Sequence, residues 1–194
     1  VSMNEFVNII IISILILSFY IYYESKHSEL EYVKSVIDNE LYLVRNRDDK
    51  DKAANTLAKI KQKLSKLVQI LEITEGNKEK VQRLVQKYNP KRISESLSGA
   101  NTTSYSINKG EKIVFCIRTK DANEKLIKFN TIMFVAIHEL AHVMTLSIGH
   151  TDEFWNNMKY LLKHAIKHGI YIKQDFKKKP EKYCGTTITD SPLQ

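Results

Sequence analysis

The stretch FNTIMFVAIHELAHVMTLSIGH, residues 129–150, decides the fold that we expect for this chain. Its apolar residues recur at helical spacing up to the glycine near its end. His138, Glu139 and His142 form an H-E-x-x-H motif within it. Residues four apart project from one face of a helix, so both imidazoles can bind one zinc ion while the glutamate reaches a water beside it. We therefore predict a metal-binding helix over residues 129–147.

The residues on either side of the motif favour metal binding over a pair of ordinary surface histidines. Ala136 and Ile137 precede it, and Val143 and Met144 follow it, all uncharged and typical of a helix that runs through a core. Burying charged imidazoles without a partner is costly, and a metal ion removes that difficulty.

A catalytic zinc site usually has three protein ligands and one open position, so a third ligand is needed. We expect His150, because Gly149 lets the chain turn sharply out of the helix. Glu153, His164 and His168 are the alternatives, although the last two histidines lie on a lysine-rich helix pattern and are better explained as exposed residues.

Residues 28–90 show a helical period in three places and predict a helical lead-in. The first pattern runs from Leu30 to Leu41, the second from Leu57 to Leu71, and the third from Val81 to Tyr88, just before Asn89-Pro90. The second pattern resembles a coiled-coil seam, but it is too short for one, and packing onto the catalytic domain explains it better.

The remaining segments predict a small antiparallel sheet and an irregular tail. Two β-prone runs in residues 104–118 flank Asn108-Lys109-Gly110-Glu111, which is typical of a hairpin, and residues 94–103 are expected to be loop. A further helix should begin after Thr151, a good N-cap, and end near Gly169. Residues 170–194 show no regular period. The expected fold class is α+β and mainly helical.

Phe6 to Tyr23 (FVNIIIISILILSFYIYY) contains no charged residue. As a helix it would be about 27 Å long, enough to cross a hydrocarbon core, and its terminal tyrosines suit the membrane interface. A cleaved signal peptide would need a basic start and small residues before the cleavage site. We therefore predict an anchor over residues 1–24 and a catalytic domain over 25–194.

The orientation of this single span, and with it the compartment, depends on few residues. Lys26 and Lys34 follow the span and no basic residue precedes it, which favours a catalytic domain on the cytosolic side of a membrane. Cys116 lies in an apolar run and Cys184 is the only other cysteine, so a disulfide framework is not indicated and a reducing compartment is expected.

The run HELAHVMTLSIGHTDEFW, residues 138–155, resembles the active-site signature of the minimal zinc metalloproteases of the WLM and SprT-like group. TSYSINKGEKI before the motif and YCGTTITDSP after it resemble segments of small WLM-like proteins of large DNA viruses. The similarity covers Leu41 to Leu193. The spacing of the second and third histidines is longer than is common in the group, so the identity of the third ligand stays open.

The resemblance implies a zincin-like domain that hydrolyses peptide bonds, with Zn²⁺ as cofactor and Glu139 as the catalytic base. It also implies that the predicted hairpin binds an extended polypeptide substrate. Tyr183 and Tyr105 are candidates for stabilising the transition state, although packing roles explain both more simply. Cys184 as an inhibitory zinc ligand is a remote alternative to an ordinary thiol.

The leading interpretation is a membrane-anchored, viral zinc endopeptidase that contacts membrane lipid through Phe6 to Tyr23. It would reside in a cellular or virion membrane, where viral capsid or membrane proteins are possible partners. The alternative is a non-catalytic virion or membrane component that keeps the zincin fold. A net charge of +8 also fits a nucleic-acid surface, but the anchor argues against that partner.

Overall fold

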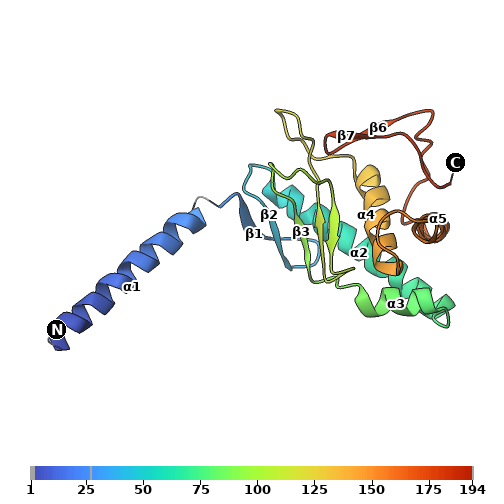
Figure 1. Ribbon diagram of the computed structural model, residues 1–194. Coiled ribbons are helices and arrows are strands. Elements are labelled where there is room, and N and C mark those ends of the chain that lie inside the picture. The colour runs from blue at the N-terminus through green and yellow to red at the C-terminus, as the bar shows by residue number, and fades with distance from the viewer. Residues whose placement is uncertain (1–2, 27, 194) are drawn as a thin grey trace.

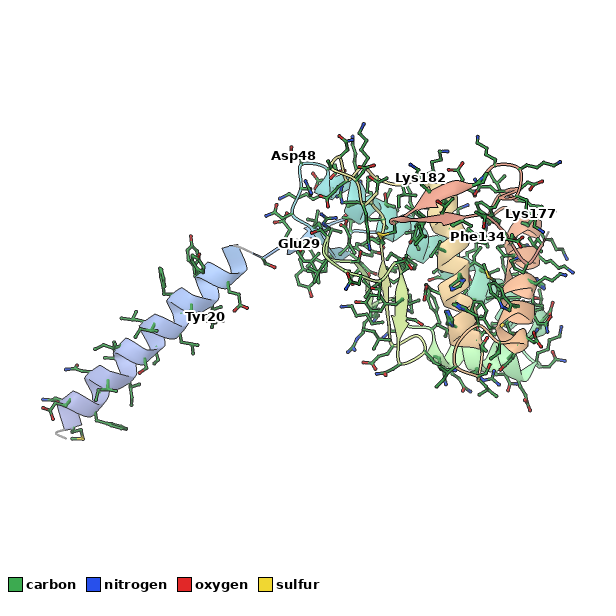
Figure 2. All side chains as sticks on the ribbon, turned by 45° about the horizontal axis from the view of Figure 1, so that its top comes forward. Tyr20, Glu29, Asp48, Phe134, Lys177 and Lys182 are labelled. Atoms are coloured by element: carbon green, nitrogen blue, oxygen red, sulfur yellow. A yellow bond between two sulfur atoms is a disulfide. The ribbon has the colours of Figure 1, made fainter. Side chains whose placement is uncertain are left out.

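The computed structural model describes residues 3–26 and 28–193 and consists of one long exposed helix and a mixed α/β domain (Figure 1). Helix α1 spans Met3–Lys26. Its stretch Met3–Glu24 is long and apolar enough to cross a membrane, and its side chains are exposed. Figure 2 shows these side chains, Tyr20 among them, projecting outward along a helix that points away from the domain.

A five-stranded sheet in the order β1-β2-β3-β5-β4 forms one layer of the domain. Its strands are β1 (Leu30–Lys34), β2 (Leu41–Arg45), β3 (Ile93–Glu95), β5 (Lys112–Phe115) and β4 (Tyr105–Ile107). β1–β2 and β4–β5 are antiparallel, whereas β2–β3 and β3–β5 are parallel. The expected small sheet is therefore mixed, and β4 lies at one of its edges.

The segment from Leu30 to Leu41 is a β-hairpin, so the helix predicted there was wrong. Asn39 adopts a positive φ of 60° in the turn, and the Asp38 carboxylate accepts a hydrogen bond from the Tyr42 hydroxyl at 2.6 Å. Alternate residues such as Tyr42 and Val44 face the core. The loop predicted over 94–103 was also partly wrong, because β3 includes Ser94 and Glu95.

Helices α2 (Lys50–Glu75) and α3 (Glu79–Lys87) confirm the other two lead-in patterns. α2 packs against β1, β2 and β3, and its residues Leu57, Leu64 and Leu71 are fully buried. Packing on the domain, not a coiled-coil seam, therefore explains its periodicity. The metal-motif helix α4 (Phe129–Met144) lies beside β4 and contacts α2, α3 and α5 (Asp152–Lys167).

The tail predicted to be irregular contains a two-stranded hairpin of β6 (Glu181–Tyr183) and β7 (Thr186–Ile188). Its turn is formed by Cys184 and Gly185, both with positive φ. Cys184 forms a disulfide with Cys116 directly after β5, across a sequence separation of 68 residues. The expectation of unpaired cysteines was therefore wrong: local sequence gave no indication that these two segments meet.

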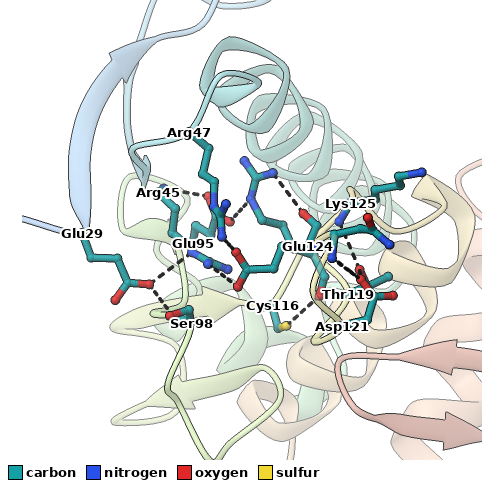
Figure 3. Close-up of polar contacts among 12 residues, drawn as sticks. Glu29, Arg45, Arg47, Glu95, Ser98, Cys116, Thr119, Asp121, Glu124 and Lys125 are labelled. Carbon is teal, nitrogen blue, oxygen red and sulfur yellow. Dashed lines mark hydrogen bonds and ion pairs between the residues drawn. The ribbon is translucent and has the colours of Figure 1, made fainter.

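Buried charges join the ends of strands β2 and β3 to the segment after β5, next to Cys116 (Figure 3). Arg118 is 2% exposed and pairs with Glu95 at 2.7 Å and with Asp49 at 2.6 Å. Arg45 and Arg47 both pair with Glu124. Burial raises the pKa of Glu95, and hydrogen bonds and charges from Arg45 and Arg118 oppose this shift. These contacts join β2, β3 and the start of α2 to the segment that leads into α4.

Candidate metal centre

The three histidines expected to bind zinc lie together. α4 presents His138 and His142 on one face with their Nε2 atoms 3.2 Å apart, and Nε2 of His150 lies 3.1 Å from that of His138. One ligand atom from each residue lies within 4.8 Å of the others. Two nitrogen ligands of a tetrahedral zinc ion are separated by about 3.3 Å, given Zn–N bonds of about 2.0–2.1 Å. This donor set therefore fits zinc.

The protonation state of the histidines also suits metal binding. Burial lowers the pKa of His138 to about 3, and the neighbouring His142 and His150 add to the shift. Burial lowers the pKa of His142 to about 4, with contributions from His150 and Lys109. Both imidazoles are neutral at physiological pH, which is the form that binds a metal.

An aromatic side chain that sequence analysis did not single out supports all three histidines. Phe154 is fully buried, and its ring centroid lies 4.8 Å from His138, 4.3 Å from His142 and 4.7 Å from His150. Trp155 follows it and packs against His150 at 5.6 Å. Thr151 caps helix α5 as predicted, and its side chain accepts a hydrogen bond from the Phe154 N–H. The cap therefore places Phe154 beneath the histidine cluster.

Hydrogen bonds hold the loop between α4 and α5 from both sides. They explain how His150 can lie beside His138 despite the long spacing between His142 and His150. Lys109 Nζ donates to the carbonyl oxygens of Thr145, Leu146 and Ser147. The Glu153 carboxylate accepts hydrogen bonds from the N–H groups of Leu146 at 3.0 Å and Ser147 at 3.1 Å. The β4–β5 turn and the first turn of α5 thus fix the loop.

Gly110 brings that β4–β5 turn against α4. Its φ is +111°, and an added Cβ would meet the Lys87 carbonyl oxygen at 2.6 Å and the Val143 side chain at 2.8 Å. A larger residue could not approach so closely. The predicted turn residues therefore dock the hairpin onto the metal helix, and Lys109 reaches the histidine loop from there.

Glu139 lies next to the histidine cluster and is 3% exposed. Burial raises the pKa of its carboxyl to about 8, although a hydrogen bond from the backbone of Ser106 opposes the shift. Ser106 is the middle residue of β4, so the edge strand and the proposed base are in direct contact. A carboxyl with such a pKa can exchange a proton near neutral pH.

A cavity of about 640 Å³ opens over Glu139 and the three histidines. β4 lines one side of it and the β6–β7 hairpin lines another. Tyr105 is partly exposed at its wall, whereas Tyr183 is buried and its hydroxyl lies 2.6 Å from Ser104 Oγ. Burial and the nearby Glu139 raise the pKa of Tyr183 well above its ordinary value, so the hydroxyl stays protonated. Both predicted tyrosines therefore border the cavity.

The alternative third ligands lie elsewhere or have other partners. Glu153 caps the loop as described, and His164 pairs with Glu75 at 3.1 Å. His168 stacks on His164 with a centroid distance of 6.4 Å. Cys184 is engaged in the disulfide and has no free thiolate to offer.

The family model for the WLM domain matches residues 37–193, which is more than half of the sequence. The chain belongs to the WLM family. Uncharacterized protein R325 of Acanthamoeba polyphaga mimivirus is 31% identical over 189 residues, which cover 95% of each chain. Uncharacterized protein 136R of Invertebrate iridescent virus 6 is 39% identical over 69 residues, covering 35% of this chain and 38% of that protein.

The fold of this WLM protein is similar to that of two crystal structures of Wss1 from Saccharomyces cerevisiae, one of them a mutant. The TM-score is 0.50 for both. The first is 22% identical and covers 65% of this chain and 88% of the solved Wss1 chain, and the mutant is 20% identical with coverages of 66% and 92%. The resemblance inferred from the motifs is thereby confirmed, and the chain is a metalloprotease-family protein with viral relatives.

Proposed function

We propose that this protein is a membrane-anchored zinc peptidase in which His138, His142 and His150 bind the metal and Glu139 is the catalytic base. The observation that carries the proposal is the convergence of three imidazole nitrogens beside a buried glutamate in an open cavity. Zinc bound there would act as a Lewis acid that polarises a carbonyl group and activates water.

The residues around the cluster suit amide hydrolysis. In the proposed reaction the Glu139 carboxylate takes a proton from the attacking water and returns it to the leaving amine nitrogen. A bound cation nearby would favour the charged carboxylate and so counteract the effect of burial on its pKa. Tyr183 keeps its proton and is a candidate hydrogen-bond donor to the developing oxyanion, with partly exposed Tyr105 as the second candidate.

The substrate class follows from the edge strand. β4 pairs with β5 on one side, and residues 103–106 line the cavity on the other. An extended polypeptide can add to such an edge through main-chain hydrogen bonds, which would lay a peptide bond across the histidine cluster. We therefore propose an extended or unfolded polypeptide as the substrate.

We further propose that α1 anchors the enzyme in a membrane. Its length, composition and exposed side chains support this role. The lysines at positions 26 and 34 favour a cytosolic domain, but the Cys116–Cys184 disulfide favours an oxidising compartment. A disulfide is the stronger of the two signals because the charge bias consists of only two residues. We therefore favour the non-cytosolic side over the side expected from sequence.

The decisive experiment compares wild type with Glu139→Gln, both full-length in detergent and loaded with zinc. The zinc content of each is measured by elemental analysis, and cleavage is followed with unfolded casein as the probe. We expect equal zinc in both proteins and cleavage by wild type alone. Equal zinc with no difference in cleavage between the two would contradict the proposal and favour a non-catalytic membrane or virion component.

A further inference from the structure

A second cavity of about 470 Å³ adjoins the first. Phe134, His138 and Ile188 line both cavities, so they meet at the histidine cluster. The remaining walls come from α5, through Trp155 and Met158, and from residues 190–192 of the tail. A ligand held at the metal centre would therefore lie at the entrance of this second cavity.

The walls of the second cavity are mainly apolar and well supported. Met158 is 1% exposed and Phe134 is 6% exposed. The Phe134 ring packs on Phe176 with centroids 4.7 Å apart and on Tyr171 at 6.0 Å, so other side chains hold this wall in place. Trp155 is 42% exposed and lines the same cavity. Thioether and aromatic walls of this kind favour an aromatic side chain.

Negative charge at the rim of the second cavity disfavours an acidic side chain as its occupant. Asp190 lines the cavity and is exposed; its carboxylate accepts a hydrogen bond from the Ser191 N–H at 2.7 Å and lies 3.5 Å from Lys177 Nζ. Lys177 is itself exposed, so this ion pair is well solvated and only weakly neutralises the rim. An acidic guest would meet like charge there.

We propose that the second cavity is a specificity pocket for an aromatic side chain adjacent to the scissile bond. The proposal rests on the proposed peptidase function and deepens it. A volume of about 470 Å³ lies within the range of about 300–1,000 Å³ that is usual for ligand pockets. The pocket thus selects uncharged aromatic residues, whereas β4 binds the backbone without regard to sequence.

The test measures binding, so it does not depend on turnover. Trp155 is the only tryptophan of the chain, and its fluorescence reports on this pocket. Zinc-loaded full-length protein is titrated with phenylalanine hydroxamate and with alanine hydroxamate, which share a metal-binding group and differ in the side chain. We expect the aromatic compound to bind at least about tenfold more tightly, a difference of about 1.4 kcal/mol.

Two variants in strand β7 distinguish binding in the second cavity from binding at the metal centre. Ile188→Phe fills the shared entrance, and we expect the ratio of the two dissociation constants to fall towards one. Thr187→Phe is the matched control, because Thr187 is exposed and lines neither cavity, and its ratio should equal that of wild type. Thermal melting and zinc content establish that both variants fold.

Three results would overturn the proposal of a specificity pocket. They are a ratio near one in wild type, failure of both compounds to bind while zinc is retained, and an unchanged ratio in Ile188→Phe. These results are distinguishable from failure of the peptidase proposal. A strong aromatic preference without any casein cleavage would support the specificity pocket and contradict the peptidase function. Casein cleavage together with a ratio near one would support the peptidase function and contradict the specificity pocket.

Discussion

At the scale of single residues, the first prediction concerns the raised pKa of the buried Glu139 carboxyl. In the metal-free chain burial raises its pKa from 4.5 to about 8. A raised pKa contributes stability that is complete below about pH 4.5 and is lost as the pH rises through about 8. Metal-free Glu139→Gln should therefore be more stable than metal-free wild type at pH 8–9, by a few kcal/mol, since one pKa unit is worth ~1.4 kcal/mol.

Urea unfolding of both metal-free proteins at pH 5 and at pH 8.5 measures this difference. His138 and His142 change stability in the opposite sense, because their lowered pKa values remove stability as the pH falls below 6.5. That effect is common to both proteins and cancels in the comparison. A difference in unfolding free energy that is the same at the two pH values would contradict the raised pKa.

The role of His150 is the second prediction at this scale. His150→Ala removes one of three converging ring nitrogens. We expect zinc affinity to fall by more than ~10–100-fold, which is the loss typical of replacing a residue that supports a ligand without binding the metal. His168→Ala is the matched control, because that imidazole stacks on His164 away from the cluster. Competition with a zinc chelator gives both dissociation constants, and equal values for the two variants would exclude His150 as a ligand.

At the scale of elements, the β4–β5 hairpin is coupled to the metal loop through Lys109. Lys109→Met keeps the length of the side chain but removes the donor to the carbonyl oxygens of Thr145, Leu146 and Ser147. A less ordered loop should weaken zinc binding about tenfold. Lys112→Met, in the adjacent strand, is the control and should bind zinc like wild type. Unchanged zinc affinity in Lys109→Met would show that Glu153 alone is sufficient to hold the loop.

Elements with a strong local signal were predictable from the sequence. The periods in α2 and α4, the Thr151 cap and the turn at Asn108–Gly110 all produced the expected structure. H-E-x-x-H with a following histidine also sufficed to predict which side chains would come together. In each case the deciding contacts lie within a few residues of one another.

Elements that depend on distant partners were not predictable in the same way. The segment from Leu30 to Leu41 fits a helical period by coincidence, whereas its structure depends on pairing with β2, which itself pairs with β3 about fifty residues later. Phe154 gave only a local helix signal, yet it contacts three histidines brought together by the fold. Lys109 and Ser104 likewise acquire their roles only once hairpin, loop and tail are assembled.

At the scale of the whole molecule, the exposed helix α1 and the domain predict separable behaviour. Deleting residues 1–26 should move the protein from the membrane to the soluble fraction, because the removed helix carries the apolar span Met3–Glu24. Flotation with phospholipid vesicles measures the distribution. The matched control replaces Ile10, Ile14 and Leu17 by Ala, which shortens the apolar surface but keeps the helix and should weaken flotation only in part. Undiminished flotation of the deletion variant would assign membrane binding to the domain instead.

The Cys116–Cys184 disulfide connects the end of the sheet to the hairpin that covers the cavity. Ser104 Oγ accepts a hydrogen bond from the Cys116 N–H at 3.0 Å and contacts the Tyr183 hydroxyl, so the covalent link lies directly behind the cavity wall. Closing a loop of 68 residues stabilises the folded state by up to about 4 kcal/mol in the chain-entropy description.

We therefore expect dithiothreitol to lower the melting temperature of wild type and to leave that of Cys116→Ser/Cys184→Ser unchanged. Because neither cysteine belongs to the histidine cluster, the double variant should retain zinc. Its cleavage of casein should nevertheless fall, since the hairpin that carries Tyr183 and Ile188 is no longer tied to the sheet. Melting temperatures that are equal with and without reductant in wild type would show that the two cysteines are not bonded in the folded protein. The domain would then be compatible with the reducing side of the membrane.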